Sequence, residues 1–185
     1  MNEARHHARA IKEEAEKLLD TTHIRELLAQ FGKVDLGGSF AYDLMVDRDL
    51  DFGVAVESIT VATRTKIASL FASQPWTYSM NMTDRVNFEP LSNPGAPRGL
   101  YLGLTIPFPK ERWNIDVWFI VSDELPPNDL AEQMTQATQE QRAAILQVKY
   151  DLMKRGAKEK GVTSAEIYAA VLNKHITTTE EFLSL

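Results

Sequence analysis

The stretch LGGSFAYDLMVDRDLDF, from Leu36 to Phe52, decides the interpretation of this chain. It ends in a predicted strand whose side chains alternate between two faces, so Asp49 and Asp51 share one face and Leu50 lies on the other. Two carboxylates about 7 Å apart along a strand repel each other unless a cation lies between them. Mg²⁺ and Mn²⁺ prefer oxygen ligands of this kind and bind through one or two carboxylates together with substrate phosphates. Taken alone, the pair has a second interpretation, as the solvated face of an exposed strand.

A glycine-rich turn lies just before this strand. Gly37, Gly38 and Ser39 follow a short apolar run and precede residues 40–45, which we expect to form a short helix. Glycines let the backbone approach a ligand closely, and a helix N-terminus offers N–H groups and a positive dipole end to an anion. Alone, the triplet is an ordinary turn. Followed ten residues after Ser39 by Asp49, it indicates a phosphate site beside a cation site.

A third carboxylate lies in a very apolar segment, WNIDVWFIV at residues 113–121. The odd-numbered residues of this predicted strand are apolar and share one face, whereas Asp116 lies on the other. A buried carboxylate is costly unless it is paired, protonated or bound to a metal. If this strand lies beside residues 49–51, the three carboxylates converge. The alternative is an edge-strand Asp116 paired with Arg112 or Lys110.

The rest of the pattern predicts an α+β protein, a mixed β-sheet flanked by helices with a C-terminal helical extension. Thr138 with Gln141, and Thr163 with Glu166, have the spacing of capping boxes that open helices. The expected strands are 34–36, 50–56, 76–82, 100–107 and 113–121, and the expected helices before residue 126 are 3–19, 23–30 and 60–73. We expect residues 1–126 to hold the N-terminal helices and the sheet, and residues 127–185 to form a helical region packed on it.

Composition limits the classes of function. The 185 residues are 44% hydrophobic and 25% charged, which excludes wholesale disorder, and the absence of cysteine excludes disulfides and a thiol nucleophile. The formal net charge of −6 is unfavourable for gripping a long polyanion without metal ions. No apolar run has the length of a membrane span, and the first residues are too charged for a signal peptide. These features predict a soluble, cytoplasmic protein.

The motifs in residues 34–56 and 113–121 together resemble the nucleotidyltransferase superfamily typified by DNA polymerase β. The small-molecule enzymes that modify antibiotics and the minimal stand-alone nucleotidyltransferases are most similar in size. The resemblance implies a nucleotidyltransferase core: a mixed sheet that carries a glycine–serine cradle and three carboxylates. It covers about a sixth of the chain and rests on motifs that are specific only in combination.

The resemblance also implies roles for individual residues. Gly38 and Ser39, with Gly37 before them, correspond to the triphosphate cradle, and Asp49 and Asp51 to the ligands of two Mg²⁺ (or Mn²⁺) ions. Asp116 corresponds to the third carboxylate, which acts either as a metal ligand or as a general base. Lys149, at the edge of the apolar stripe of a predicted helix, is a further candidate for nucleotide binding; its alternative is a surface lysine with a buried stem.

The implied activity is transfer of a nucleoside monophosphate from an NTP such as ATP to a hydroxyl of a small molecule or protein, with release of pyrophosphate. We expect no nucleic-acid or membrane partner, because no basic stripe or apolar span is present. The alternative is a catalytically silent nucleotide-binding or antitoxin-like regulatory module of the same fold. Retention of all three carboxylates favours activity.

Other conspicuous residues are expected to have structural roles. Asp43 is interpreted as a surface acid of the short helix rather than a fourth ligand. The strand aromatics are expected to be mostly core, with one of them a candidate to stack on the base or the acceptor: Trp76, Tyr78, Tyr101, Trp113 and Trp118.

Overall fold

The computed structural model describes residues 2–88, 97–122, 129–156 and 161–185. The chain forms two compact units. The sheet unit consists of Ala15–Gly38 and Arg48–Pro126, and the helical unit of Met1–Glu14, Ser39–Asp47 and Pro127–Leu185. The boundary expected between residues 126 and 127 lies outside the described residues. No helix in the described part of the chain is long and apolar enough to cross a membrane.

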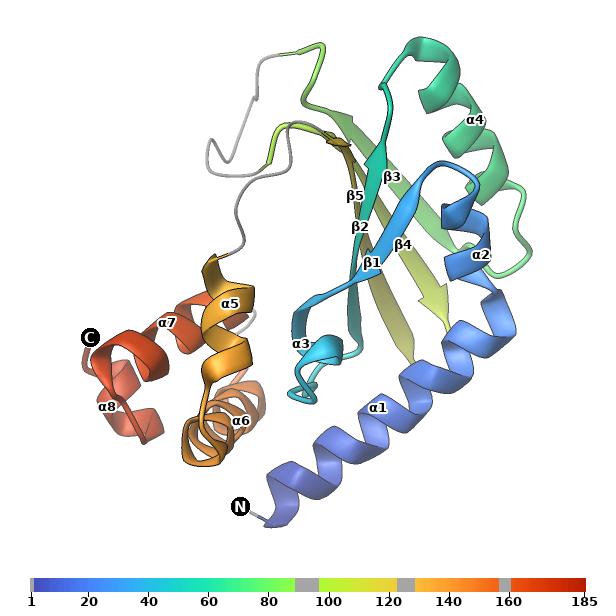
Figure 1. Cartoon of the computed structure of the whole chain (residues 1–185). Helices are drawn as coiled ribbons and strands as arrows, with labels where there is room; N and C mark the ends of the chain where they lie inside the picture. The colour runs from blue at the N-terminus through green and yellow to red at the C-terminus, as the bar shows by residue number, and fades with distance from the viewer. Residues whose placement is uncertain (1, 89–96, 123–128, 157–160) are drawn as a thin grey trace. The chain divides into compact units, whose positions relative to one another are not determined.

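The sheet unit is built on one five-stranded mixed sheet with the strand order β1-β2-β5-β4-β3 (Figure 1). The central pair, β2 and β5, is parallel, and the other three pairs are antiparallel. The α+β class and the mixed sheet predicted from the sequence are therefore confirmed. The strands are β1 (Lys33–Leu36), β2 (Asp49–Val56), β3 (Ser79–Asp84), β4 (Leu100–Pro107) and β5 (Arg112–Val121).

One face of this sheet is buried, as the alternation of apolar residues predicts. Helices α2 (Ile24–Ala29) and α4 (Val61–Ala72) lie on the same side of the sheet in Figure 1. Phe31, just after α2, packs edge-on against Phe119 of β5, with 5.8 Å between ring centroids. The side chains of β2 and β5 that form this core are at most 3% exposed: Leu50, Phe52, Val54, Val56, Trp113, Ile115, Val117 and Phe119. Asp49, Asp51 and Asp116 lie on the opposite face.

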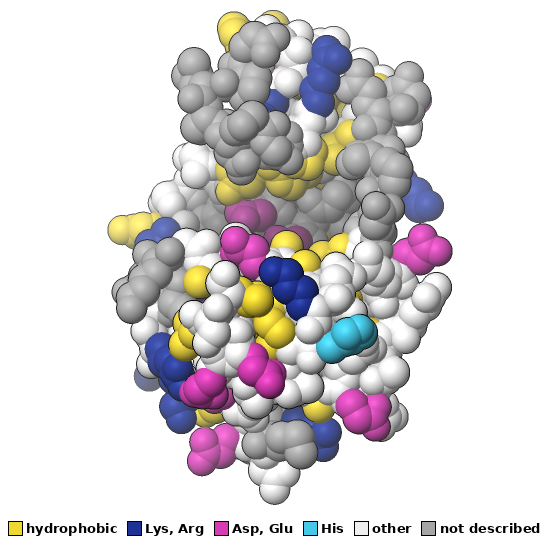
Figure 2. All heavy atoms as spheres, turned by 90° about the vertical axis from the view of Figure 1, so that its left-hand side faces the viewer, with side chains coloured by type: hydrophobic (Ala, Val, Ile, Leu, Met, Phe, Trp, Pro, Cys, Tyr) yellow, Lys and Arg dark blue, Asp and Glu magenta, His cyan; other side chains and the backbone are white. Residues whose placement is uncertain are grey.

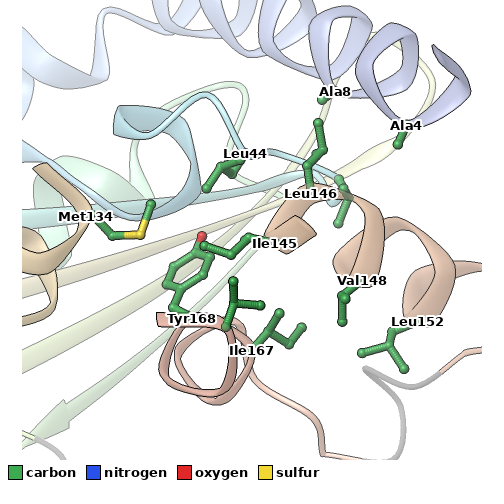
Figure 3. Close-up of a cluster of buried hydrophobic side chains, with 12 residues drawn as sticks. Ala4, Ala8, Leu44, Met134, Ile145, Leu146, Val148, Leu152, Ile167 and Tyr168 are labelled. Atoms are coloured by element: carbon green, nitrogen blue, oxygen red, sulfur yellow. The ribbon is translucent and has the colours of Figure 1, made fainter. Parts of the chain in front are cut away.

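The helical unit has its own apolar core (Figure 3). Residues of α6 (Gln139–Lys154) and α7 (Ser164–Lys174) pack against Leu44 and against Ala4 and Ala8 of α1 (Asn2–Thr22). The unit also contains α5 (Asp129–Gln136) and α8 (Thr179–Leu183), and α3 (Gly38–Ala41) begins at the junction with the sheet unit. Both predicted capping boxes open their helices, α6 and α7.

Several expected boundaries are shifted for local reasons. The first helix was expected to end before Asp20 but continues to Thr22, and the Thr21 and Thr22 hydroxyls donate to the carbonyls of Lys17 and Leu18 one turn back. Helix α3 is a single turn rather than a helix over residues 40–45. Asp43 follows it in the left-handed region, at φ 58°, and pairs with Lys12, so it is a turn residue rather than a helix-surface acid.

The strand expected over residues 76–82 begins three residues later. The Thr77 hydroxyl donates to the Phe71 carbonyl and the Trp76 ring packs on Phe71, so this segment folds back on the end of α4. Tyr78 was expected to be a core residue, but it is 78% exposed, so this prediction is wrong. Trp76, Tyr101 and Trp118 are partly exposed, and Trp113 is fully buried.

A pair of glycine substitutions tests this packing. A Cβ added at Gly32 would overlap the backbone carbonyl of Ala55, whereas one added at Gly53 would meet no described atom within 4 Å. We expect Gly32→Ala to lower the free energy of unfolding by about 1–3 kcal/mol. Gly53→Ala should raise it by about 0.5–1 kcal/mol, because Ala loses less conformational freedom than Gly in a strand. Urea unfolding measures both, and equal values for the two variants would contradict the packing described at Gly32.

Candidate functional site

Three carboxylates meet on the face of the sheet opposite its apolar core. Asp49 and Asp51 alternate with the buried Leu50 on β2, and Asp116 lies on β5. The parallel register puts Asp51 directly opposite Asp116. The N–H of Asn114 donates to the carbonyl of Arg48 at 3.0 Å and fixes this register at the start of both strands. One oxygen from each carboxylate lies within 4.8 Å of the others.

The chemistry of this acidic triad, Asp49, Asp51 and Asp116, fits a divalent cation. Three carboxylates so close repel one another when all are charged. Their oxygens are the ligands that Mg²⁺ and Mn²⁺ prefer. Asp51 is exposed and the other two are partly buried, so a cation with further water or phosphate ligands can reach them. Within the described residues, no other trio of His, Asp and Glu side chains comes this close.

Tyr101 of β4 is a site residue that the sequence did not single out. Its hydroxyl donates to Asp116 Oδ1 at 2.7 Å. Burial raises the pKa of Tyr101 above its usual value, and the hydrogen bond to Asp116 and the negative charges of the triad raise it further. From the alternation of residues, Tyr101 is recognisable only as an aromatic residue of a strand. Its hydrogen bond to Asp116 could not be predicted, because it depends on the pairing of β4 with β5.

Glycine at position 103 makes room for this contact. Gly103 lies opposite Asp116 in the β4–β5 register, between Tyr101 and the carboxylate. A Cβ there would come within 2.7 Å of the Tyr101 hydroxyl and 2.6 Å of Asn81 Oδ1, and the Gly103 N–H donates to that same Asn81 oxygen at 3.2 Å. Tyr101 therefore reaches Asp116 diagonally across a residue without a side chain.

The predicted phosphate cradle begins beside Asp51. The Gly37 N–H donates to the Asp51 carbonyl at 2.9 Å and extends the sheet, so this donor is already engaged. Gly38 has φ +59°, and a Cβ on it would overlap the Asp51 carboxylate, so both conformation and space require glycine there. Ser39 is the next residue along the chain and belongs to the helical unit, where its carbonyl accepts from the Leu44 N–H at 2.9 Å.

Lys149 is buried within the helical unit rather than lying on its surface. It is 4% exposed, and its Nζ donates to the Leu44 carbonyl at 2.8 Å and to the Tyr168 hydroxyl at 3.3 Å. The ammonium also lies over the Tyr168 ring. The alternative interpretation as a snorkelling surface lysine is therefore wrong, and a role in nucleotide binding stays a prediction.

Surface charge on the visible face is mixed. Figure 2 shows Lys and Arg side chains interspersed with Asp and Glu in the coloured part of this face, without one continuous basic stripe. His7 is a structural residue of the helical unit, with its Nε2 2.8 Å from the Val46 carbonyl oxygen. Neither feature adds a second candidate site.

Neither family models nor curated proteins match this sequence. Solved structures do match it by fold. They include the polymerase core of TRAMP, an RNA surveillance complex (17% identity, TM-score 0.53), the GLD-2/RNP-8 complex (14%, 0.54) and a cytoplasmic RNA terminal U-transferase (12%, 0.54). The matches cover 90%, 89% and 93% of this chain but 47%, 64% and 51% of those chains, so this chain spans about half to two thirds of their length. At these identities the likeness shows the fold, and the fold expected from the resemblance is confirmed.

Cation binding by the acidic triad is directly testable. We expect the protein to bind Mn²⁺ and Asp51→Asn to weaken that binding by more than roughly 100-fold, because residues that merely orient a ligand already contribute 10–100-fold. Without metal and at low ionic strength, Asp51→Asn should melt at a higher temperature than the wild type, because one of three repelling charges is removed. Isothermal titration and thermal melts measure the two effects. Asp20→Asn, at an exposed acid of α1, is the matched control, and unchanged Mn²⁺ affinity in Asp51→Asn would contradict the site.

Tyr101 makes the stability depend on alkaline pH. Because its pKa is raised in the folded state, the folded protein keeps this proton above pH 10, where an unfolded tyrosine with the ordinary pKa of 10.0 loses it. The unfolded state then binds fewer protons, so the free energy of unfolding falls as pH rises beyond that value. The urea midpoint should therefore fall between neutral pH and a pH above 10, and this fall should be smaller in Tyr101→Phe than in the wild type. Tyr78→Phe, at an exposed tyrosine, is the control and should behave as the wild type.

Proposed function

We propose that the chain is a divalent-cation-dependent nucleotidyltransferase that moves a nucleoside monophosphate from an NTP to an acceptor hydroxyl and releases pyrophosphate. The observation that carries this proposal is the acidic triad on β2 and β5, with its oxygens within 4.8 Å of one another. A protein without a cation to bind gains nothing from holding three repelling carboxylates together. The fold shared with a polymerase core and an RNA terminal U-transferase supports the same class of reaction.

In this proposal Asp49 and Asp51 are the residues that would hold the cations next to the α-phosphate of the NTP. A pair of divalent ions would stabilise the charge that develops on the entering and leaving oxygens. Asp116 completes the cation site or takes the proton from the acceptor hydroxyl. Oδ1 of Asp116 accepts a hydrogen bond from Tyr101, which would orient the carboxylate for either role.

The remaining predicted residues would bind the triphosphate. The backbone at Gly38 and Ser39 is the proposed cradle, because Gly38 brings the chain against Asp51 without a side chain and the helix α3 starts there. Gly37 would contribute by its conformation, since its N–H is engaged in the sheet. Lys149 would supply a positive charge after giving up part of its present hydrogen bonding to Leu44 and Tyr168.

Two kinds of acceptor are proposed for different reasons. The net charge of −6 and the mixed surface charge favour a small hydroxylated molecule, or a protein, over a long polyanion. The second candidate is the 3′-hydroxyl of an RNA, which the RNA terminal U-transferase and the RNA surveillance polymerase core among the structural neighbours favour. The competing proposal of a silent or antitoxin-like module keeps the nucleotide but has no acceptor.

Pyrophosphate release tests the activity. We expect release when the protein is incubated with Mg²⁺, an NTP and a suitable acceptor, and a loss of orders of magnitude in Asp49→Asn, Asp51→Asn and Asp116→Asn, because each removes charge that holds the cations. A screen of ATP, GTP, CTP and UTP against polyols, aminocyclitols, a protein mixture and an oligoribonucleotide separates the acceptors. Asp20→Asn should keep full activity. Mg²⁺-dependent NTP binding without release from any acceptor would instead support the silent module.

A further inference from the structure

The face of the sheet that carries the acidic triad also carries an aromatic residue next to it. Trp118 lies on β5 two residues after Asp116, and therefore on the same face of the strand and about 7 Å along it. Resting on the function proposed above, we propose that Trp118 is the platform on which a planar ring of the acceptor stacks. The acceptor would then be a molecule that carries a planar ring beside its reactive hydroxyl.

The two neighbours of Trp118 in the sheet differ sharply. On one side, Tyr101 of β4 is its register partner, and the two rings are in contact with centroids 5.1 Å apart and planes tilted by 47°. On the other side, its partner is Gly53 of β2, and no described atom lies within 4 Å of the position that a Cβ on Gly53 would occupy. The partly exposed indole is thus supported on its β4 side, and no described residue fills the space beside Gly53 on its β2 side.

The support is itself held in place. The Tyr101 hydroxyl donates to Asp116 at 2.7 Å, so the ring that contacts Trp118 is anchored at its far end by a member of the triad. Because the anchored Tyr101 ring is in contact with the Trp118 indole, it restricts the indole, which then loses little freedom when a ligand stacks on it. The same hydrogen bond therefore orients both the Asp116 carboxylate and the Tyr101 ring that contacts Trp118.

The in-line geometry of phosphoryl transfer favours stacking of the acceptor, rather than of the NTP, on Trp118. In phosphoryl transfer the entering and leaving oxygens lie roughly in line on opposite sides of the phosphorus. Gly38 approaches Asp51 from the β1 edge, which places the proposed triphosphate cradle and the leaving pyrophosphate on that side. The entering hydroxyl then comes from the β5 side, where Asp116 and Trp118 lie.

Neither of the other two tryptophans offers this geometry. Trp113 is fully buried on the opposite face of β5, and Trp76 packs on Phe71 in the turn after α4. Trp118 alone of the three shares a sheet face with the triad. Aromatic rings prefer offset or edge-on contact with other rings, so a planar ligand uses this surface better than an aliphatic sugar does.

Adenosine is the probe, because it joins a planar ring to sugar hydroxyls and needs neither an NTP nor a cation. We expect the intact chain to bind adenosine in isothermal titration but not methyl β-D-ribofuranoside, which has the same sugar without the ring. Trp118→Leu should weaken adenosine binding by roughly 5- to 150-fold, the range for loss of one base-stacking aromatic. Trp118→Phe should keep most of the affinity, and Trp76→Leu is the matched control that should keep all of it. Gly53→Val should weaken binding by filling the open space beside Trp118.

Each arm can overturn the proposal. The absence of adenosine binding, equal binding of the methyl riboside, or an unchanged affinity in Trp118→Leu would each overturn it. Displacement of adenosine by a non-hydrolysable NTP with Mg²⁺ would assign the ring to the NTP and would also overturn it, whereas simultaneous binding supports it. Circular dichroism of each variant shows whether it has folded. Because the titration contains no NTP, its failure is separate from a failure of pyrophosphate release.

Discussion

The parallel pairing of β2 with β5 is the constraint on which the rest of this structure depends. The pairing that puts Asp51 opposite Asp116 also puts Leu50 opposite Ile115 and Phe52 opposite Val117. Because side chains alternate along a strand, a slip of one residue would turn the carboxylates into the core and the apolar residues outward. The cost of exposing that core therefore holds the acidic triad together against its own repulsion, and the folding energy of the sheet maintains the site.

Three glycines and three carboxylates lie close to the paired strands β2 and β5, and both kinds of residue lower the stability of the fold while leaving room and charge for a ligand. Gly38 has a positive φ and lies next to the Asp51 carboxylate, and Gly103 makes room for the Tyr101 hydroxyl. At Gly53, no described atom lies within 4 Å of the position that a Cβ would occupy. Glycine inside a strand weakens it, and clustered carboxylates lower the free energy of unfolding. Departures of this kind from locally favourable choices are expected at functional sites, where the surrounding structure compensates for them. Their concentration on one face of one sheet supports a single site there.

The sequence predicted what depends on local periodicity and on spacing along the chain. Alternation over residues 49–56 and 113–121 was enough for the two central strands, their buried face and the shared face of the carboxylates. It could not predict the hydrogen bond from Tyr101 to Asp116, because that contact depends on which strands are neighbours. The late start of β3 was missed for a related reason, because Thr77 and Trp76 contact Phe71 at the end of α4 instead of continuing the strand.

The net charge of the chain needs to be considered together with this geometry. Acidic residues exceed basic ones by six, and three of the acids form the triad. Two divalent cations bound there would add four positive charges beside three carboxylates, so the triad would attract phosphates more strongly once the cations are bound. The net charge of the whole chain therefore has to be weighed together with the charge that the proposed cations would bring to the triad. Because salt screens charges beyond about 10 Å, this attraction would act only close to the triad, where the proposed triphosphate and acceptor hydroxyl would meet.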